Sequence, residues 1–191
     1  MNRPATDTIL APGPLVLAVM ILLAALSRLL PHPPNFSPVE AIALFGGAYF
    51  ASRQWAAVVP LLAMLVSDLA LGALHGAGYA TYLGGVSFWS VYACVGLSVL
   101  LGFGLRGKVG GARVLAYALT GSVLFFAVTN FTAWLSDPQY AKTSAGLAAA
   151  YIAGIPFFRW SVLGTLGYSA ILFGGFALLR RRIPALRMQT V

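Results

Sequence analysis

The sequence predicts an all-α fold, a polytopic membrane protein built as a six-helix bundle. Of its 191 residues, 60% are hydrophobic and only 8% are charged, whereas soluble domains carry roughly 25% charged residues. Its longer apolar runs reach the roughly 20 helical residues that a membrane span needs. Nearly all of its 12 Lys and Arg residues flank these runs, which is the distribution that sets membrane topology.

Six hydrophobic segments can be placed along the chain. The second is short, so we expect it to be tilted or buried among its neighbours. It carries a stripe of small residues, Ala43-x-x-x-Gly47-x-x-x-Ala51, which is expected to pack against another helix of the same chain. The segments form one membrane domain, residues 14–182, between tails of residues 1–13 and 183–191. The expected segments are 14–30, 38–52, 55–74, 86–105, 113–135 and 160–179.

The Lys and Arg residues also predict an orientation. With the N-terminal tail inside, nine of the 12 lie on the inner side, and Arg28, Lys142 and Arg159 lie on the outer side. Cytoplasmic loops carry such an excess of positive charge, so both tails are expected in the cytoplasm. Most of the other polar side chains then fall at or near the outer side, as expected of a protein that receives something from outside.

Asp68 lies inside the third segment, where a carboxylate costs about 2.5–3.5 kcal/mol to insert. One interpretation is a contact with a ligand, because ionisable groups within a membrane usually serve function. The other is a structural acid that pairs within the bundle, with Arg28, Asn130 or Arg159 as the candidate partners. His75 follows two helical turns later and faces the same way as Asp68 if the helix continues.

The connector between the first two segments is rich in proline. Four of its eight residues from Pro31 to Pro38 are prolines, which fix φ and exclude regular helix. His32 and Asn35 are therefore held in a stiff segment, either a plain linker or the rim of a binding site. The stretch Ser37-Pro-Val-Glu40 has the form of a capping box, so its glutamate is expected to bind the cap amide.

Residues 136–158 are expected to form a long outer connector. A short helix within it is predicted to begin at Thr143 or Ser144 and to end near residues 154–156. Long loops of this kind are often lids over a binding site, and this is the function expected of the connector.

Aromatic and polar side chains gather where this connector meets the fifth and sixth segments. Asn130 and Trp134 end the fifth segment, and Arg159 and Trp160 begin the sixth. The aromatic residues are interpreted either as an aromatic belt at the membrane interface or as a stacking surface for a planar ligand.

Several functions are disfavoured by the residues present. The single cysteine, Cys94, permits neither an intrachain disulfide nor a Cys-based zinc site, and no convincing metal-ligand set accompanies it. The chain lacks the Gly-x-x-x-x-Gly-Lys loop of nucleotide-binding proteins. Its positive charges flank apolar runs, unlike a nucleic-acid-binding surface. Neither paired carboxylates nor a Ser–His arrangement indicates an enzyme, and no cofactor is expected.

A set of motifs spread over most of the chain resembles a family of uncharacterised bacterial inner-membrane proteins. The motifs are Arg28-x-x-Pro-His-Pro-Pro-Asn-Phe-x-Pro38, Ala43-Leu-Phe-Gly-Gly47, Ser67-Asp68, Thr129-Asn-Phe131 and Ala153-Gly-Ile-Pro-Phe-Phe158. That family is similar, more distantly, to the substrate-binding S components of energy-coupling factor (ECF) transporters. The resemblance implies an S-component-like bundle with cytoplasmic termini. It also implies an outer pocket for a vitamin or metal ion under the loops after the first, third and fifth spans.

S components typically dock ECF energising subunits through an Ala-x-x-x-Ala face on the first helix. Here Ala18 and Ala25 are seven residues apart, so the chain departs from that pattern. Docking to such subunits and transport by this chain alone both remain open.

We therefore expect a transporter or substrate-binding subunit that captures a small nutrient, such as a vitamin or cofactor precursor, in an outward-facing pocket. Its expected partners are this small molecule and the lipid bilayer of a bacterial inner membrane. The alternatives are a scaffold of the same fold that binds proteins rather than solutes, and a membrane enzyme. The residues expected to contact the substrate are His32, Asn35, Asp68, His75, Asn130, Trp134, Tyr151 and Arg159.

Overall fold

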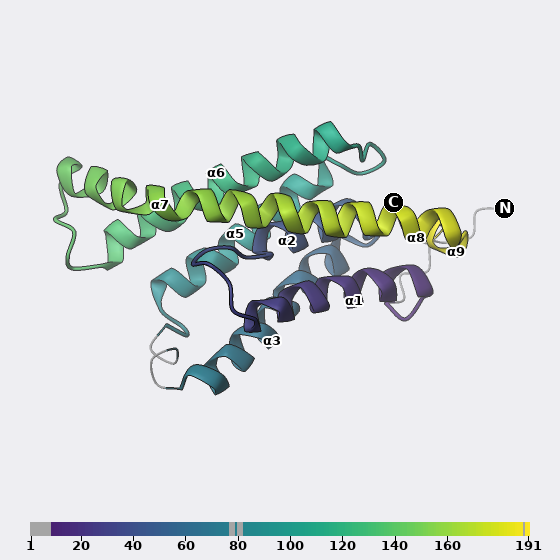
Figure 1. Ribbon diagram of the computed structural model, residues 1–191, viewed down its shortest axis with the longest axis horizontal. Helices are drawn as coiled ribbons and strands as arrows, with labels where there is room; N and C mark the ends of the chain where they lie inside the picture. The colour runs from purple at the N-terminus through teal and green to yellow at the C-terminus, as the bar shows by residue number, and fades with distance from the viewer. Residues whose placement is uncertain (1–8, 77–78, 80–81, 189) are drawn as a thin grey trace.

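The computed structural model describes residues 9–76, 79, 82–188 and 190–191, and all of its regular elements are helical (Figure 1). Two short elements differ from the α-helix: η1 is a 3₁₀ turn, and η2 is a π-helical turn. In chain order the elements are α1 Pro12–Leu26, η1 Ser27–Leu29, α2 Val39–Tyr49, α3 Arg53–His75, α5 Val86–Phe103, α6 Gly111–Ser136, α7 Ser144–Ser169, η2 Ala170–Gly174, α8 Gly175–Arg182 and α9 Ala185–Met188.

The all-α prediction is confirmed, and the protein is a multi-pass membrane protein. In the described part of the chain, five helical stretches are long and apolar enough to cross a membrane. Their outward faces carry exposed leucines, such as Leu62, Leu65 and Leu69 on α3, which suit contact with lipid. A helix is the natural choice there because lipid offers no hydrogen bonds to the backbone. The five stretches are Pro12–Leu29, Arg53–His75, Val86–Phe103, Gly111–Ser136 and Ser144–Arg182.

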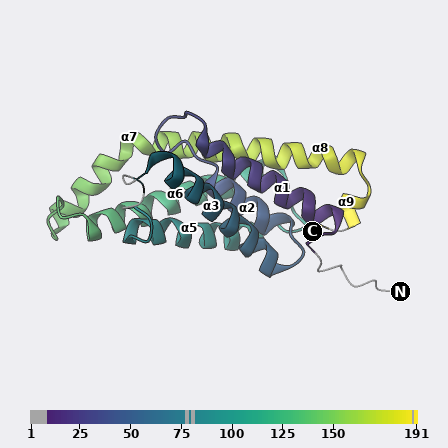
Figure 2. The same cartoon turned by 90° about the horizontal axis from the view of Figure 1, so that it is seen from below.

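The bundle has two distinct ends. The described chain enters at α1 and leaves at α9, and these two helices are in contact at one end of the bundle (Figures 1 and 2). We call this the terminal end and the opposite one the distal end. The connections that follow η1, α3 and α6 lie at the distal end (Figure 1). Six passes of the chain through the bundle, α2 included, bring it back to its starting side.

The centre of the bundle is α2. All eleven of its residues are buried, although at about 1.5 Å per residue it is roughly half as long as a membrane core is thick. A Cβ atom added to Gly47 would lie 2.3 Å from the Val99 carbonyl oxygen of α5, and one added to Gly46 would lie 2.8 Å from Pro60 of α3. The small-residue stripe is therefore an intramolecular seam at Gly47, as expected, and the neighbouring Gly46 lets a third helix meet it.

Arg106 holds the terminal end of α2. Its guanidinium donates hydrogen bonds to the carbonyl oxygens of Gly47 and Phe50, at 2.9 and 2.8 Å. These carbonyls belong to the last turn and cap of the helix, where no intrahelical donor remains. A cation at this position is also favoured by the helix dipole.

The expected lid is not a loop. Residues 144–158 belong to α7, which runs without a break from Ser144 to Ser169 and continues through η2 into α8. Thr143 does cap this helix, since its side chain accepts a hydrogen bond from the Gly146 amide. The predicted stop at residues 154–156 was wrong, because Pro156 lies inside the helix. Proline is tolerated in membrane helices, where neighbouring groups satisfy the freed carbonyl.

The α6–α7 hairpin that replaces the lid extends beyond the other helices at the distal end (Figure 1). Its short connection is tied by Lys142, whose ammonium donates to the carbonyl oxygens of Asp137 and Tyr140 at 3.1 and 3.2 Å. The predicted sixth segment therefore begins sixteen residues too late, at Trp160 instead of Ser144.

The seam predicts the effect of enlarging Gly47. We expect Gly47→Ala to lower the free energy of unfolding by about 1–3 kcal/mol, the usual cost of overpacking a core. The matched control is Gly96→Ala on α5, where an added Cβ atom meets nothing within 4 Å. That substitution should be neutral or stabilising, because alanine favours helix over glycine. Thermal unfolding of the two purified variants in detergent checks the difference, and equal melting temperatures would contradict the seam.

Candidate functional site

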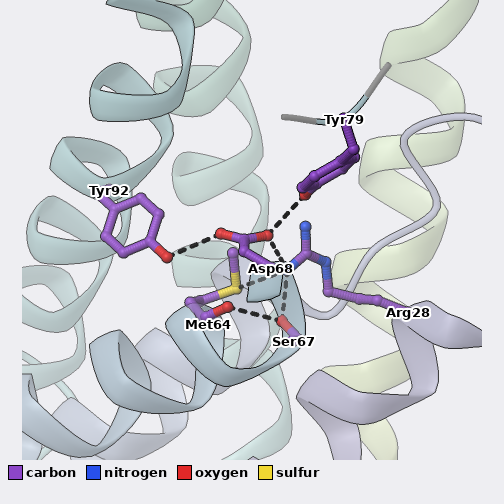
Figure 3. Close-up of polar contacts among 6 residues, drawn as sticks. All are labelled: Arg28, Met64, Ser67, Asp68, Tyr79 and Tyr92. Carbon is purple, nitrogen blue, oxygen red and sulfur yellow. Dashed lines mark hydrogen bonds and ion pairs between the residues drawn. The ribbon is translucent and has the colours of Figure 1, made fainter. Parts of the chain in front are cut away.

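Asp68 is the centre of a buried polar cluster (Figure 3). It is 1% exposed, and one carboxylate oxygen lies 2.7 Å from an Arg28 guanidinium nitrogen. The same oxygen accepts a hydrogen bond from the Tyr79 hydroxyl at 2.9 Å, and the other accepts one from Tyr92 at 2.8 Å. Arg28 also donates to the Ser67 hydroxyl. The carboxylate is thus paired with a cation and two hydroxyl donors.

This cluster joins four parts of the chain. Arg28 comes from η1, Asp68 from α3, Tyr92 from α5, and Tyr79 from the connection between α3 and α5. A buried ion pair offsets its desolvation cost only when its remaining lone pairs are also satisfied, and here they are. Of the pairings considered for a structural acid, the structure shows the one with Arg28. Whether Asp68 also contacts a substrate stays a prediction.

Tyr79 lies outside the membrane-spanning helices, and burial together with the hydrogen bond to Asp68 raises the pKa of its hydroxyl. It therefore stays protonated at neutral pH and can donate to the carboxylate. Burial likewise raises the pKa of Tyr82 on the same connection. Both tyrosines line the space beside them, and the Tyr79 hydroxyl donates its hydrogen bond to Asp68.

That space is a cavity of about 570 Å³ at the distal end, which we call the distal cavity. His32, Asn35 and His75, three of the residues expected to contact a substrate, line this cavity. Asp68 does not line it, but it contacts Arg28 and Tyr79, which do. Pockets of this size accommodate small organic ligands. The complete lining is Arg28, Leu29, Leu30, Pro31, His32, Asn35, Ser37, Val39, Glu40, Leu71, His75, Tyr79, Tyr82, Val91, Phe125 and Ser161.

A smaller side cavity of about 200 Å³ adjoins it between α6 and α7. Asn35, Phe125 and Ser161 line both cavities, and Asn130 lines only the smaller one. The Asn130 amide donates to the Phe126 carbonyl oxygen at 2.8 Å and fills the space that a side chain at Gly154 would need.

The distal cavity exists because α2 is short. The proline-rich connector enters the bundle in front of α2 and packs closely against α7. A Cβ atom added to Gly164 of α7 would lie only 2.7 Å from the Ser37 backbone nitrogen. Asn35 adopts a positive φ of 64°, which asparagine tolerates better than most residues. His32 Nδ1 lies 2.9 Å from the Pro33 carbonyl oxygen. The stiff connector therefore shapes the cavity wall, and its role as the rim of a binding site stays a prediction.

Glu40 has a different role from the one expected. The capping-box prediction was wrong, because Pro38 instead of Ser37 is the N-cap of α2 and the Ser37 hydroxyl makes no hydrogen bond with the described residues. Glu40 is 4% exposed and lines the distal cavity, and its Oε1 atom has no hydrogen-bond partner among the described residues. Ser37 faces the same cavity with an unpartnered hydroxyl. The pattern of residue types matched a capping box, but the chain enters α2 with a different backbone geometry.

Three of the expected contacts lie away from both of these cavities. The Trp134 indole donates to the Ala141 carbonyl oxygen at 2.9 Å, and the Tyr151 hydroxyl donates to the Ala127 carbonyl oxygen at 2.7 Å. Arg159 is exposed and lies 5.1 Å from the centre of the Trp160 ring. The first two contacts tie α6 to the connection and to α7, whereas the Arg159–Trp160 contact lies within α7. Direct contact of the three side chains with a ligand stays a prediction.

A third cavity, of about 780 Å³, opens at the terminal end, and we call it the terminal cavity. Its walls include Ala118 of α6, Leu166 and Ser169 of α7, and Tyr49 at the end of α2. The π-helical turn contributes Ala170, and such turns are frequent at functional sites. The two larger cavities therefore approach the bundle centre from opposite ends.

A family model described as "Family of unknown function (DUF6580)" matches residues 9–186. The chain belongs to this family. Neither a curated protein nor a solved structure matches the chain. Within the described residues, no group of three or more His, Cys, Asp or Glu side chains could hold a metal ion. The site must therefore be interpreted from its own residues.

Sequence reasoning missed several residues of this site. Tyr79, Tyr82 and Tyr92 received no role, although a buried carboxylate requires donors and tyrosine is a common one. Arg28 was assigned only as a structural partner, yet it also lines the distal cavity. For Glu40 the capping role was preferred over a ligand role, because its local pattern matched a capping box position by position.

The Asp68 cluster predicts a stability effect. Asp68→Asn leaves Arg28 as an unpaired cation, and breaking a buried pair in this way costs about 3–5 kcal/mol. Adding Arg28→Met should recover part of the loss, because it removes the stranded charge. Melting temperatures of the wild type, both single variants and the double variant form a cycle that measures the coupling. A wild-type melting temperature for Asp68→Asn would contradict the role of the pair.

Proposed function

We propose that the protein binds a small polar solute in the distal cavity and works as a membrane transporter or as its substrate-binding subunit. The observation that carries the proposal is the cavity itself. It lies at one end of a membrane bundle. Ionisable and hydrogen-bonding side chains line it, chiefly Arg28, His32, Glu40 and His75. Apolar and aromatic walls with a few convergent polar groups are typical of small-molecule sites.

The charges of the cavity suggest the type of solute. Arg28 is compensated by Asp68, whereas Glu40 has no cationic partner among the described residues. The imidazoles and phenols can donate or accept hydrogen bonds. A small nutrient with several polar groups, such as a vitamin or cofactor precursor, fits a 570 Å³ space with this lining.

The resemblance to S components supports the same proposal. The resemblance implies that the connections after the first, third and fifth passes lie together. With α2 counted as the second pass, these are the connections after η1, α3 and α6, and they lie at one end (Figure 1). The first two of them line the distal cavity. The energy source is a separate question, and ECF-type energising subunits or transport by this chain alone both fit the bundle.

The protein is proposed to lie in the bacterial inner membrane with its terminal end in the cytoplasm. Arg53, Arg106, Lys108 and Arg113 sit at or next to the connections of the terminal end, together with the arginines that close α8. Arg28 and Lys142 lie toward the distal end. The distal cavity would then face outward.

A scaffold that binds another membrane protein is the second candidate. The observation in its favour is the α6–α7 hairpin, which extends past the other helices and exposes apolar side chains. Ile152, Ile155 and Phe157 of α7 are among them. This candidate needs no solute in the distal cavity, so solute binding separates the two.

Solute binding is tested by native mass spectrometry of the protein purified from its own cell membranes, followed by identification of retained small molecules. We expect the wild type to retain a small molecule that His75→Ala and Asn35→Ala lose, because both side chains line the cavity. The matched control is Thr120→Val, whose exposed hydroxyl binds only its own helix. Retention by all four proteins alike, or by none, would contradict a solute site in this cavity.

Orientation is tested with a reporter fused after Val191. We expect a fluorescent reporter that matures in the cytoplasm to be active there, and a reporter that needs the periplasm to be inactive, because positive charge favours the cytoplasmic side. The opposite result would place the distal cavity in the cytoplasm and reject uptake from outside.

A further inference from the structure

The two larger cavities are separated by a thin barrier. On α7, Ser161 lines the distal cavity and Leu166 already lines the terminal one, a separation of about 7.5 Å at 1.5 Å per residue. On α6, Phe125 lines the distal cavity and Ala118 lines the terminal one, and they are about 10 Å apart along the helix axis. Both separations are short beside a typical hydrocarbon core, which is roughly 30 Å thick.

The barrier is polar. Ser161, Thr165 and Ser169 recur every four residues on one face of α7, and all three are buried. The first lines the distal cavity and the last lines the terminal cavity. Ser122 of α6 lies between the two cavity-lining residues of that helix, one turn after Ala118 and one turn before Phe125. Hydroxyls therefore continue through the barrier on two adjacent helices.

Most of these hydroxyls lack a partner. Thr165 Oγ1, Ser169 Oγ and Ser122 Oγ make no hydrogen bond with the described residues, and neither does Ser98 Oγ of α5. A buried polar group without a partner costs about 1–3 kcal/mol, and in native proteins it usually binds water or serves a function. Unpartnered hydroxyls on three neighbouring helices, α5, α6 and α7, therefore call for a common explanation.

Glu40 stands where this set of hydroxyls meets the distal cavity. An added Cβ atom at Gly121 would lie 3.9 Å from both the Glu40 Cβ atom and the Ser98 hydroxyl oxygen, and the Thr165 hydroxyl also lies near the Glu40 carboxyl. The carboxyl is nearly fully buried, lines the distal cavity, and keeps Oε1 unpartnered.

We propose that Glu40 binds and releases a proton, and that Thr165, Ser169, Ser122 and Ser98 form with water a path that carries this proton between the distal and terminal cavities. Carboxyl groups inside membranes commonly relay protons, and a hydroxyl can donate and accept at once. The inference rests on the proposed function in one respect: the proton would drive solute movement through the same bundle.

The step is a simple proton transfer. The Glu40 carboxylate takes a proton from hydronium in the distal cavity and becomes a neutral carboxyl. It then gives that proton to water in the hydroxyl path, which delivers it as hydronium to the terminal cavity. Only O–H bonds form and break, and one proton has crossed the barrier.

Other titratable groups surround the carboxyl without replacing it. Arg28, His32, His75, Tyr79 and Tyr82 line the same cavity from η1, α3 and the two connections. Arg28 is already paired with Asp68. Cys94 of α5 lies within electrostatic reach of Glu40, but it is fully buried. Among the described side chains, Glu40 is thus the acid that both faces the cavity and adjoins the hydroxyl path.

The test measures proton flux into liposomes that contain the purified full-length protein and a pH-sensitive dye. A potassium gradient with valinomycin sets an inside-negative potential, and the rate of internal acidification is recorded. We expect the wild type to acidify the lumen faster than protein-free liposomes. Glu40→Gln, Thr165→Val and Ser169→Ala should reduce the rate to that of protein-free liposomes.

Matched controls separate the path from general damage. Thr120→Val and Ser90→Ala remove exposed hydroxyls that bind only their own helices, and both should keep the wild-type rate. Thr165→Val leaves the Glu40 carboxyl in place, and its melting temperature shows whether it folds. It therefore keeps the test decisive even if Glu40→Gln fails to fold.

Wild-type flux equal to that of protein-free liposomes would overturn the proton path, and so would unchanged flux in Thr165→Val and Ser169→Ala. Solute retention in the distal cavity would still stand in either case, because mass spectrometry measures it independently. Conversely, flux that depends on Glu40 in a protein that retains no solute would reject the proposed function and leave the path intact.

Discussion

The length of α2 is the constraint on which the rest of the structure depends. A helix of eleven residues covers about 16 Å, so it fills only part of the bundle axis. Gly46 and Gly47 let α3 and α5 close around it, and Arg106 satisfies its last carbonyls. The space in front of it is left to a stiff, proline-rich connector, and the distal cavity opens there.

Two buried acids in this bundle meet opposite electrostatic conditions. Asp68 is paired with Arg28 and bound by two tyrosine hydroxyls, so its negative charge is stabilised and its role in the fold is to join helices. Glu40 has no cation beside it and keeps an oxygen unpartnered at the cavity wall. In a medium of low polarity, an isolated carboxylate is costly and a neutral carboxyl is much cheaper. Glu40 is therefore the acid whose charge state can respond to a ligand or a proton.

The arrangement of cavities is the structural basis of the proposed transport function. Two cavities enter from opposite ends and leave a barrier of a few helical residues between Ser161 and Leu166. The π-helical turn after Ser169 lies beside one of them, where the regular hydrogen-bond ladder is already altered. A thin barrier with polar side chains requires little rearrangement to pass a proton.

The sequence by itself determined the class of the protein, its six hydrophobic passes and the polar character of one end, because lipid forces apolar helices and leaves their spacing visible in the chain. It also found His32, Asn35 and His75, which line the distal cavity. Only the tertiary structure decided the surroundings of the two acids, because burial and partners come from other helices. It likewise turned the supposed lid into α7, since Pro156 is accommodated within a packed helix.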